Sequence, residues 1–527
     1  MEKRSISLFV FFCLCFTGLM LRIAFIGSSE FSSVSQGRSR RTVTVGESRG
    51  KIYDRNLKKL VDRENKLIAA VSPVVGSVDF LGFMSDMDSF NNKITNGAPF
   101  AVEVNEKINN EFIRTFDVPV RYTENQPAVH LIGYLTSDGK SGVSGLEKAY
   151  NSFLKKNGGS LTVSFEVDAK GRVLAGMDKY VNDNNFNSQS GIVLTLDRDI
   201  QLAVENILEK SSVKSGCALV IRTDTGEIIA AASVPIYNPC NVAEALYKDN
   251  SPLINKVLQQ YSVGSVFKPL IAAVALENGI SPETEYECTG ECSVGEESFA
   301  CYNSTAHGTV NMQQALENSC NCYFIELMDR IDMEHLLKLC RDIGIGEGDS
   351  IASGINTSSG RILDEKELKI KGEAANLAFG QGSLLMTPIQ MAKLYTVLAT
   401  GNLVSPELIY GLMNDDGRVS LKEKEAPQKL LTDSTVKEIK KMLSSVVERG
   451  NADKAFSEKV LLAGKTGTAQ SGIFNNGKEI CRTWFAGFCP ADNPRYAVIV
   501  MNEDGTTGNA DCAPVFSKIC EELINCE

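Results

Sequence analysis

The longest run of hydrophobic positions lies at the start of the chain, over residues 6–26, and contains one charged residue, Arg22. A helix of this length can cross a bilayer, and a charged side chain near its end can extend to the headgroups. A cleaved signal peptide is the alternative, but no small-x-small cleavage site follows the run. We therefore expect a short tail, residues 1–5, and one retained transmembrane anchor, residues 6–26.

Further along the chain, strand-like and helix-like patterns alternate. Two β-type runs flank Asp224-Thr225-Gly226, which predicts a hairpin whose turn uses the glycine. Apolar residues recur at helical spacing over 198–210, and residues 250–400 are mostly helical in pattern. Strand patterns return in VLLAGKTGTA, RTWFAGFCP and RYAVIVMNED. Strands at both ends with helices between them predict an α+β fold, in which helices flank an antiparallel sheet.

Breaks in the pattern divide the chain into domains. A polar linker covers residues 27–45, and a mixed segment with Gly- and Asn-rich breaks follows at 46–185. Residues 181–191, VNDNNFNSQSG, are almost all turn formers and mark a boundary. The second domain is expected over 190–527. A chain of 527 residues is also too long for one hydrophobic core.

Composition narrows the class of protein. With 43% hydrophobic and 23% charged residues, the chain is typical of globular proteins rather than of disordered or polytopic membrane proteins. The formal net charge of −11 argues against nucleic acid as a general partner, because phosphate binding needs a basic surface.

Fifteen cysteines are many for an exported chain, and Cys288, Cys292 and Cys301 lie in one Gly- and Glu-rich stretch. This stretch could be a loop tied by a disulfide. Zinc is the competing interpretation, but the chain has three histidines and no paired CxxC units. Buried or unpaired thiols are the simpler expectation, so we expect no metal site and no cofactor.

One Ser-x-x-Lys motif stands out among several in the chain. Ser265 and Lys268, in YSVGSVFKPL, follow a glycine and precede an apolar helix with Pro269 directly after the lysine. Proline fits only the first turn of a helix, so the helix must begin just after Ser265. Lys268 then lies one turn further on, on the same side as the serine. A desolvated lysine with a lowered pKa can serve as the base that activates a serine.

Two further motifs follow in order. Ser319-Cys320-Asn321 ends a helical run, and Lys465-Thr466-Gly467-Thr468 follows an apolar strand. Ser319 can relay a proton, and Asn321 can hydrogen-bond a substrate amide. Lys465 adds positive charge near that relay, Thr466 and Thr468 offer hydroxyls to a terminal carboxylate, and Gly467 permits close approach. The backbone N–H groups of Ser265 and Thr468 can form an oxyanion hole.

The ordered triple of motifs resembles that of the penicillin-binding transpeptidases, within the serine β-lactamase superfamily. RGKIYDRN from Arg49 and GVSGLEKAYN from Gly142 look like the pedestal of the class B, monofunctional members. TLDRDIQ, VPIYNP, FGQG and TPIQMA are further matches, so the resemblance covers nearly the whole chain.

The resemblance implies a pedestal domain and a transpeptidase domain with a five-stranded sheet between helical layers. It also implies an extracytoplasmic location on a single anchor and cross-linking of peptidoglycan stem peptides through a Ser265 acyl-enzyme, which β-lactams acylate. The resemblance and the lack of a glycosyltransferase module together imply a polytopic glycosyltransferase partner.

Other functions with the same motifs stay open. A catalytically weak scaffold and a β-lactam-binding sensor are the alternatives, and carboxypeptidase activity differs only in the acceptor, which is water. A β-lactamase would need a water-activating group that the sequence does not reveal. The process that the protein serves, in division, elongation or sporulation, cannot be read from the motifs.

Overall fold

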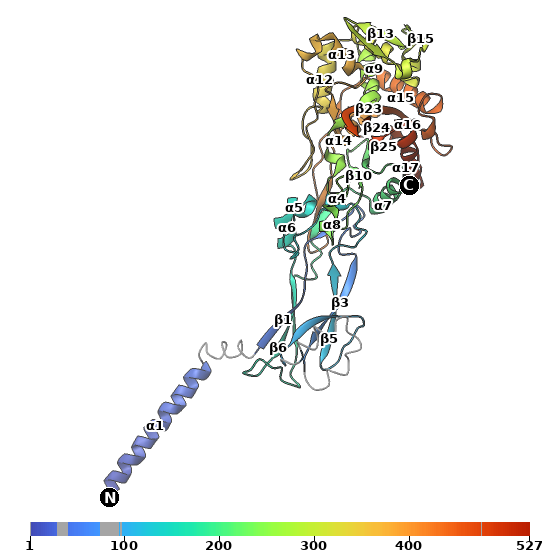
Figure 1. Ribbon diagram of the computed structural model, residues 1–527. Coiled ribbons are helices and arrows are strands. Elements are labelled where there is room, and N and C mark those ends of the chain that lie inside the picture. The colour runs from blue at the N-terminus through green and yellow to red at the C-terminus, as the bar shows by residue number, and fades with distance from the viewer. Residues whose placement is uncertain (1, 29–39, 74–93, 95–96, 476, 527) are drawn as a thin grey trace. The chain divides into compact units, whose positions relative to one another are not determined.

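The structure is a computed structural model that describes residues 2–28, 40–73, 94, 97–475 and 477–526 (Figure 1). Its described residues form two compact units, each made of several chain segments. The first unit contains residues 1–50, 62–121 and 155–188, and the second contains residues 51–61, 122–154 and 189–527.

The first helix, α1 (Glu2–Ser28), is exposed along its length. Its segment Arg4–Gly27 has a mean hydropathy of 2.3 and 24 residues, or about 36 Å at the rise of an α-helix. Length and composition therefore fit a single-pass membrane anchor. Among the described residues, α1 is the one helix that is both long enough and apolar enough to cross a bilayer.

Two antiparallel three-stranded sheets form the rest of the first unit. One has the order β1-β6-β7 and the other β4-β3-β5. Their apolar sides make two small clusters, one around Val163 and Phe165 and one around Val71 and Ile113. The strands are β1 (Arg40–Glu47), β3 (Glu64–Val71), β4 (Phe100–Val104), β5 (Ile113–Val120), β6 (Ser160–Glu166) and β7 (Tyr180–Asn184).

The second unit is built on a five-stranded antiparallel sheet of order β10-β9-β25-β24-β23. The α+β fold predicted from the strand and helix patterns is thus confirmed. The predicted hairpin around Gly226 is also present, since β9 pairs with β10 and Gly226 has φ 74°. The strands are β9 (Gly216–Arg222), β10 (Ile228–Val234), β23 (Ala463–Asn475), β24 (Lys478–Cys489) and β25 (Tyr496–Gly505).

Two groups of helices pack on this sheet and enclose the main hydrophobic core. One group comprises α9, α14 and α15, and the other comprises α7 and α17. Local signals fix their ends: Asp197 caps α7 through the N–H groups of Asp199 and Ile200, and Thr387 and Gln390 form a capping box on α14. The helices are α7 (Arg198–Glu209), α9 (Lys268–Glu277), α14 (Pro388–Thr400), α15 (Asp433–Glu448) and α17 (Ala513–Asn525).

A second sheet in this unit, of order β2-β8-β20-β21, explains why the unit includes residues 51–61. Strand β2 pairs in parallel with β8, with Lys51 opposite Gly191. The sequence analysis placed residues 51–61 and 122–154 in the first domain, because hydrophobic patterns do not reveal pairing between distant segments. The strands are β2 (Lys51–Tyr53), β8 (Gly191–Leu194), β20 (Ile409–Met413) and β21 (Val419–Leu421).

Short elements complete the described fold. The remaining helices are α4 (Val129–Ile132), α5 (Gly145–Ala149), α6 (Asn151–Lys156), α8 (Val242–Ala245), α10 (Met312–Glu317), α11 (Asn321–Met328), α12 (Met333–Ile343), α13 (Lys371–Ala378) and α16 (Gly508–Asp511). The remaining strands are β11 (Tyr261–Ser262), β12 (Tyr286–Cys288), β13 (Glu291–Val294), β14 (Glu297–Ala300), β15 (Gly308–Val310), β16 (Ser350–Ala352), β17 (Ile355–Asn356), β18 (Leu385–Met386), β19 (Asn402–Leu403) and β22 (Gln428–Lys429).

Candidate active site

Ser265 lies in a 3-10 turn, η3 (Gly264–Phe267), that leads directly into α9. Pro269 occupies the first turn of α9, so the predicted helix start just after Ser265 is confirmed. Gly264 has φ 71°, and its N–H donates to the main-chain oxygen of Gly380 (2.7 Å). This hydrogen bond to a distant loop holds the turn in place, while Ser265 itself stays partly exposed.

Lys268 is completely buried at the start of α9, and its amine points at the second motif. The Nζ atom donates to the main-chain oxygen of Ser319 (2.7 Å), to the Ser319 hydroxyl (3.2 Å) and to the amide oxygen of Asn321 (2.7 Å). Burial lowers the pKa of Lys268 to about 7, although electrostatic interactions with Cys320, Cys301 and Cys322 partly oppose the shift. The amine can thus be neutral near physiological pH.

The second motif occupies a break between two helices. Helix α10 ends at Glu317, and α11 begins at Asn321 with Cys320 as its N-cap. Ser319 has φ 53°, a left-handed conformation that is uncommon for serine, and this kink turns its carbonyl and hydroxyl toward Lys268. The sequence analysis expected one helical run ending here, whereas the structure divides it into two helices.

The third motif lies on β23, at the edge of the five-stranded sheet, and packs against the Ser265 turn. A Cβ atom at Gly467 would come within 3.0 Å of a Val266 methyl group and 3.1 Å of the Val263 oxygen. Glycine is therefore needed at this position so that β23 can approach the turn. On the next residue, the Thr468 hydroxyl accepts a hydrogen bond from the Gly508 N–H (3.4 Å).

Lys465 is also fully buried, and its amine donates to the main-chain oxygen of Thr466 (3.2 Å). Burial and, secondarily, the positive charge of Lys268 lower the pKa of Lys465 well below its ordinary value. The Thr466 hydroxyl donates to the amide oxygen of Asn451 (3.2 Å), in the loop after α15.

These contacts bring all three predicted motifs into one site. Lys268, Ser319 and Asn321 are directly hydrogen-bonded, Lys465 is close enough to Lys268 for their charges to interact, and Gly467 adjoins the turn that carries Ser265. A partly exposed serine, one turn before a buried amine that can be neutral, is an arrangement suited to nucleophilic catalysis. The contacts of Asn451, Gly380 and Gly508 with the three motifs are not encoded by sequence spacing, because these residues are distant from the motifs in the chain.

Two further residues lie near the site. Trp484 is fully buried, and its Nε1 donates to the Ser262 oxygen (2.9 Å), so it belongs to the core. The side-chain amide of Gln381 donates to the Thr468 oxygen (3.5 Å), which links its loop to the third motif.

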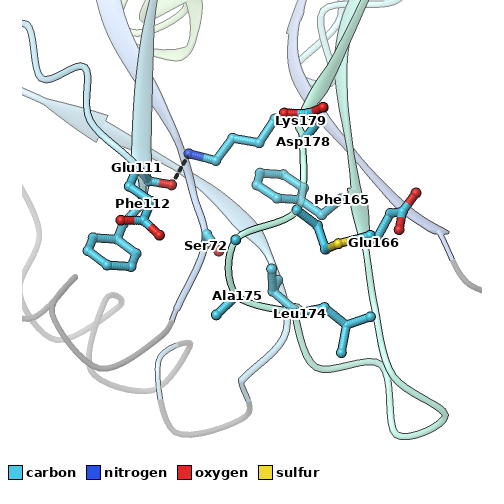
Figure 2. Close-up of a pocket in the computed structure, with 12 residues that line it drawn as sticks. Ser72, Glu111, Phe112, Phe165, Glu166, Leu174, Ala175, Asp178 and Lys179 are labelled. Carbon is cyan, nitrogen blue, oxygen red and sulfur yellow. Dashed lines mark hydrogen bonds between the residues drawn. The ribbon is translucent and has the colours of Figure 1, made fainter.

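A separate pocket lies in the first unit, between β6, the segment after it and the loop before β5 (Figure 2). Phe165 and Leu174 lie on one side of it, and Lys179 donates to the main-chain oxygen of Glu111 (2.6 Å). It shares no residue with the three motifs.

The comparisons with known proteins agree with this site. The sequence profile of the "Penicillin binding protein transpeptidase domain" matches residues 216–521, which include all three motifs. Fold and matched region thus define a protein that contains a penicillin-binding transpeptidase domain. The chain belongs to the penicillin-binding protein transpeptidase family.

Similar proteins cover more of the chain. Stage V sporulation protein D of Bacillus subtilis is 30% identical over 75% of this chain and 62% of its own length. The peptidoglycan D,D-transpeptidase MrdA of Acinetobacter baumannii is 27% identical over 97% of this chain and 86% of its own. The chain thus spans less than two thirds of the length of the Bacillus subtilis protein.

Solved structures share the fold. Penicillin binding protein 3 of Mycobacterium tuberculosis, complexed with aztreonam, has a TM-score of 0.67 at 23% identity, covering 92% of this chain and 97% of that one. Penicillin-binding protein PBP2 of Helicobacter pylori, in a complex with MreC, has a TM-score of 0.66 at 23% identity, covering 92% and 98%.

Proposed function

We propose that the protein is a peptidoglycan D,D-transpeptidase, which cross-links stem peptides through an acyl-enzyme on Ser265. The observation that carries the proposal is the buried Lys268 amine, one turn after Ser265, hydrogen-bonded to the side chains of Ser319 and Asn321. The names of relatives, peptidoglycan D,D-transpeptidases among them, support the same activity.

In the first half of the reaction, neutral Lys268 accepts the proton of the Ser265 hydroxyl. The serine oxygen forms a bond to the carbonyl carbon of the penultimate D-alanine, and the N–H groups of Ser265 and Thr468 stabilise the oxyanion. The bond to the terminal D-alanine then breaks. Its nitrogen leaves with a proton relayed from Lys268 through the Ser319 hydroxyl, which lies 3.2 Å from the amine.

In the second half, the amine of another stem peptide loses a proton to the same relay and attacks the ester. A new amide forms and Ser265 is released with its proton restored. Before the terminal D-alanine leaves, Asn321 holds the donor amide, Lys465 supplies positive charge, and Thr466 and Thr468 bind the terminal carboxylate across Gly467. No metal or cofactor takes part in these steps.

The rest of the chain fits an enzyme held at a membrane surface. We propose that α1 is the single anchor, that the two folded units lie outside the cytoplasm, and that the segments of residues 46–185 that belong to the first unit form the pedestal. A polytopic glycosyltransferase would supply the glycan strands. The complex of the H. pylori protein with MreC supports the wider proposal that this chain has protein partners.

A catalytically weak scaffold and a β-lactam sensor would have the same fold. Carboxypeptidase activity would use the same acyl-enzyme with water as the acceptor. The intact hydrogen bonds around Lys268 favour an active enzyme over a scaffold.

Intact-mass spectrometry of the detergent-solubilised chain, with and without benzylpenicillin, tests the proposal. The expected result is a persistent adduct of one penicillin per chain, absent from Ser265→Ala. Ser262→Ala, three residues earlier on strand β11, is the matched control and should still acylate. Failure of the folded wild type to acylate with several β-lactams would contradict the proposal and favour the scaffold. An adduct without cross-linking of stem peptides would favour the sensor.

A further inference from the structure

A cluster of thiols and one imidazole lies directly beside the second motif. The ligand atoms of Cys288, Cys301, His307 and Cys320 all lie within 4.8 Å of one another. The three cysteines are buried and the histidine is half-buried. Nothing in the proposed acyl transfer uses these four side chains.

Three distances inside the cluster are close to those of a tetrahedral metal site. Zinc–sulfur bonds of about 2.3 Å place two tetrahedral thiolates about 3.8 Å apart, and a thiolate and an imidazole nitrogen about 3.6 Å apart. The Sγ atom of Cys301 lies 3.7 Å from the Sγ atom of Cys288 and 3.8 Å from the Sγ atom of Cys320. The Cys288 Sγ lies 3.4 Å from the Nδ1 atom of His307.

These distances are too long for disulfides, in which the sulfur atoms are about 2.05 Å apart. The sequence analysis considered a disulfide-tied loop and set zinc aside, because it looked for paired CxxC units. The fold assembles the ligands differently. Strand β12 ends at Cys288 and pairs with β15, which begins just after His307, while the β13–β14 hairpin returns the chain to Cys301.

We propose that Cys288, Cys301, His307 and Cys320 bind one zinc ion. Three thiolates and one neutral imidazole are ligands that zinc prefers, and four protein ligands make a closed, structural site. Binding releases the protons of the three thiols to solvent, because thiolates are the ligands. This inference stands on the cluster itself and does not depend on the proposed acyl transfer.

The bound metal would stabilise the conformation of the second motif. Cys320 is the middle residue of Ser319-Cys320-Asn321, and it caps α11 through the Tyr323 N–H. The side chain of Asn321 also donates to the Ala300 oxygen (2.8 Å), next to Cys301. A metal bound to Cys301 and Cys320 would therefore hold the break between α10 and α11 against the β12–β15 region. The four ligands are positioning residues in this role.

The test is the metal content of the full chain, purified in detergent under reducing conditions and dialysed against a weak chelator. Elemental analysis should find about one zinc per chain, as for a four-ligand site. Chain prepared with Co²⁺ instead should show the visible d–d bands of tetrahedral cobalt and a thiolate-to-cobalt charge-transfer band. Wild-type chain without bound metal and without either band would overturn the proposal.

Variants separate the ligands from general effects of substitution. His307→Ala should retain metal about tenfold less well, or worse, in competition with a chelator. His307→Cys should keep the metal and strengthen the charge-transfer band, because it adds a fourth thiolate. Cys340→Ala, a buried thiol on α12 outside the cluster, should bind like wild type and is the matched control.

Two outcomes would refute the assigned ligands. Equal metal loss in Cys340→Ala and His307→Ala would mean that the loss reflects misfolding. Full retention in His307→Ala would point to Cys322, whose Sγ lies 3.6 Å from that of Cys301, as the fourth ligand. The acylation rate of His307→Ala is a second readout. We expect it to fall on the order of 10-fold, since a loosened second motif misplaces the relay, and to recover in His307→Cys.

Discussion

The buried environment of Lys268 determines the pKa of its amine. A lysine on the surface would be protonated at neutral pH, but this amine is completely buried and desolvation disfavours its charged form. Its hydrogen bonds to Ser319 and Asn321 hold it in place without neutralising it with a carboxylate. Burial therefore converts an ordinary base into one that can act near neutral pH.

The pH dependence of acylation follows from this lowered pKa. Below about pH 7 the Lys268 amine is protonated and cannot accept the serine proton. The acylation rate should therefore rise as the pH increases through about 7 and level off above it. Stopped-flow measurement with a β-lactam that does not titrate in this range would show the curve.

Lys268→Arg is the matched variant, because a guanidinium does not deprotonate in proteins. Its acylation should be lost at every pH at which the chain stays folded. A wild-type rate that keeps rising up to the ordinary lysine pKa would contradict the assignment of Lys268 as the base.

At the residue scale, the sequence could reveal groups that lie in short motifs. Pro269 fixed the helix start and hence the relation between Ser265 and Lys268. The left-handed backbone of Ser319 and the cluster around Cys301 could not be foreseen. Both depend on contacts between segments that are distant in sequence, and residue spacing does not predict such contacts.

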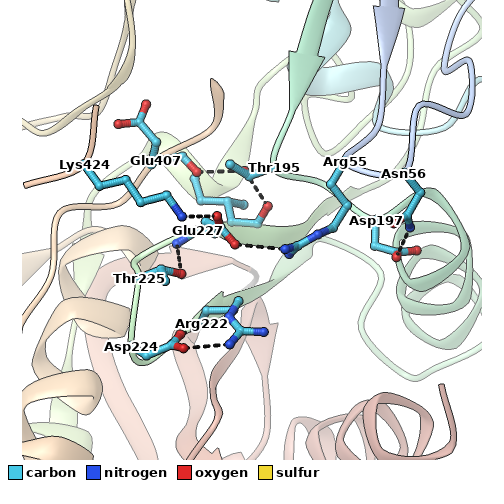
Figure 3. A network of polar contacts seen from close by, with 11 residues as sticks. Arg55, Asn56, Thr195, Asp197, Arg222, Asp224, Thr225, Glu227, Glu407 and Lys424 are labelled. Carbon is cyan, nitrogen blue, oxygen red and sulfur yellow. Dashed lines mark hydrogen bonds and ion pairs between the residues drawn. The ribbon is translucent and has the colours of Figure 1, made fainter. Parts of the chain in front are cut away.

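At the scale of elements, a buried carboxylate joins three parts of the second unit. Glu227, in the β9–β10 hairpin, forms ion pairs with Arg55, after β2, and with Lys424, after β21 (Figure 3). The Glu227 side chain is 3% exposed, whereas Arg222 and Asp224 nearby form an ion pair that is much more open to solvent. The segment after β2 is thus linked by charge to the five-stranded sheet, whereas β2 itself pairs with β8 in the second sheet.

Glu227→Gln should destabilise the fold, because it leaves Arg55 and Lys424 without their counter-charge. We expect a loss of about 1–3 kcal/mol, below the usual effect of breaking a fully buried pair, since both cations are partly exposed. Denaturant unfolding followed by tryptophan fluorescence measures this change.

Asp224→Asn is the control from the same hairpin. Its exposed pair with Arg222 should contribute about 1 kcal/mol or less. Equal effects of the two substitutions would refute a special role for Glu227.

Most elements of the second unit were predictable from periodicity and local signals. Helix α7 has its apolar spacing and its Asp197 cap, and the β9–β10 hairpin has its Gly226 turn. The break at Ser319 was missed because the residues on both sides have helical patterns. The pairing of β2 with β8 was missed because parallel partners far apart in sequence leave no local trace.

At the scale of the whole molecule, α1 determines where the protein works. The full chain should sediment with membranes and resist extraction by high salt, because the segment Arg4–Gly27 is long and apolar enough to cross a bilayer. A chain lacking residues 1–28 should be recovered in the soluble fraction and still acylate with penicillin. Fractionation followed by penicillin labelling checks both expectations.

Intact mass of the membrane-bound chain provides the control for this prediction. Retention of residues 1–28 would support an anchor. Their absence from the mature protein would show that the segment is a signal peptide and would contradict the prediction.

The interleaving of the two units also sets an order of events during synthesis. Residues 51–61 belong to the second unit, yet β2 is made well before its partner, since Lys51 and Gly191 are 191 − 51 = 140 residues apart. Strand β2 therefore stays unpaired while residues 54–190 are translated. Parts of the first unit can fold during this time. The catalytic unit therefore matures late, and a nascent chain stalled before residue 191 would expose an unpaired edge strand to whichever chaperone receives it.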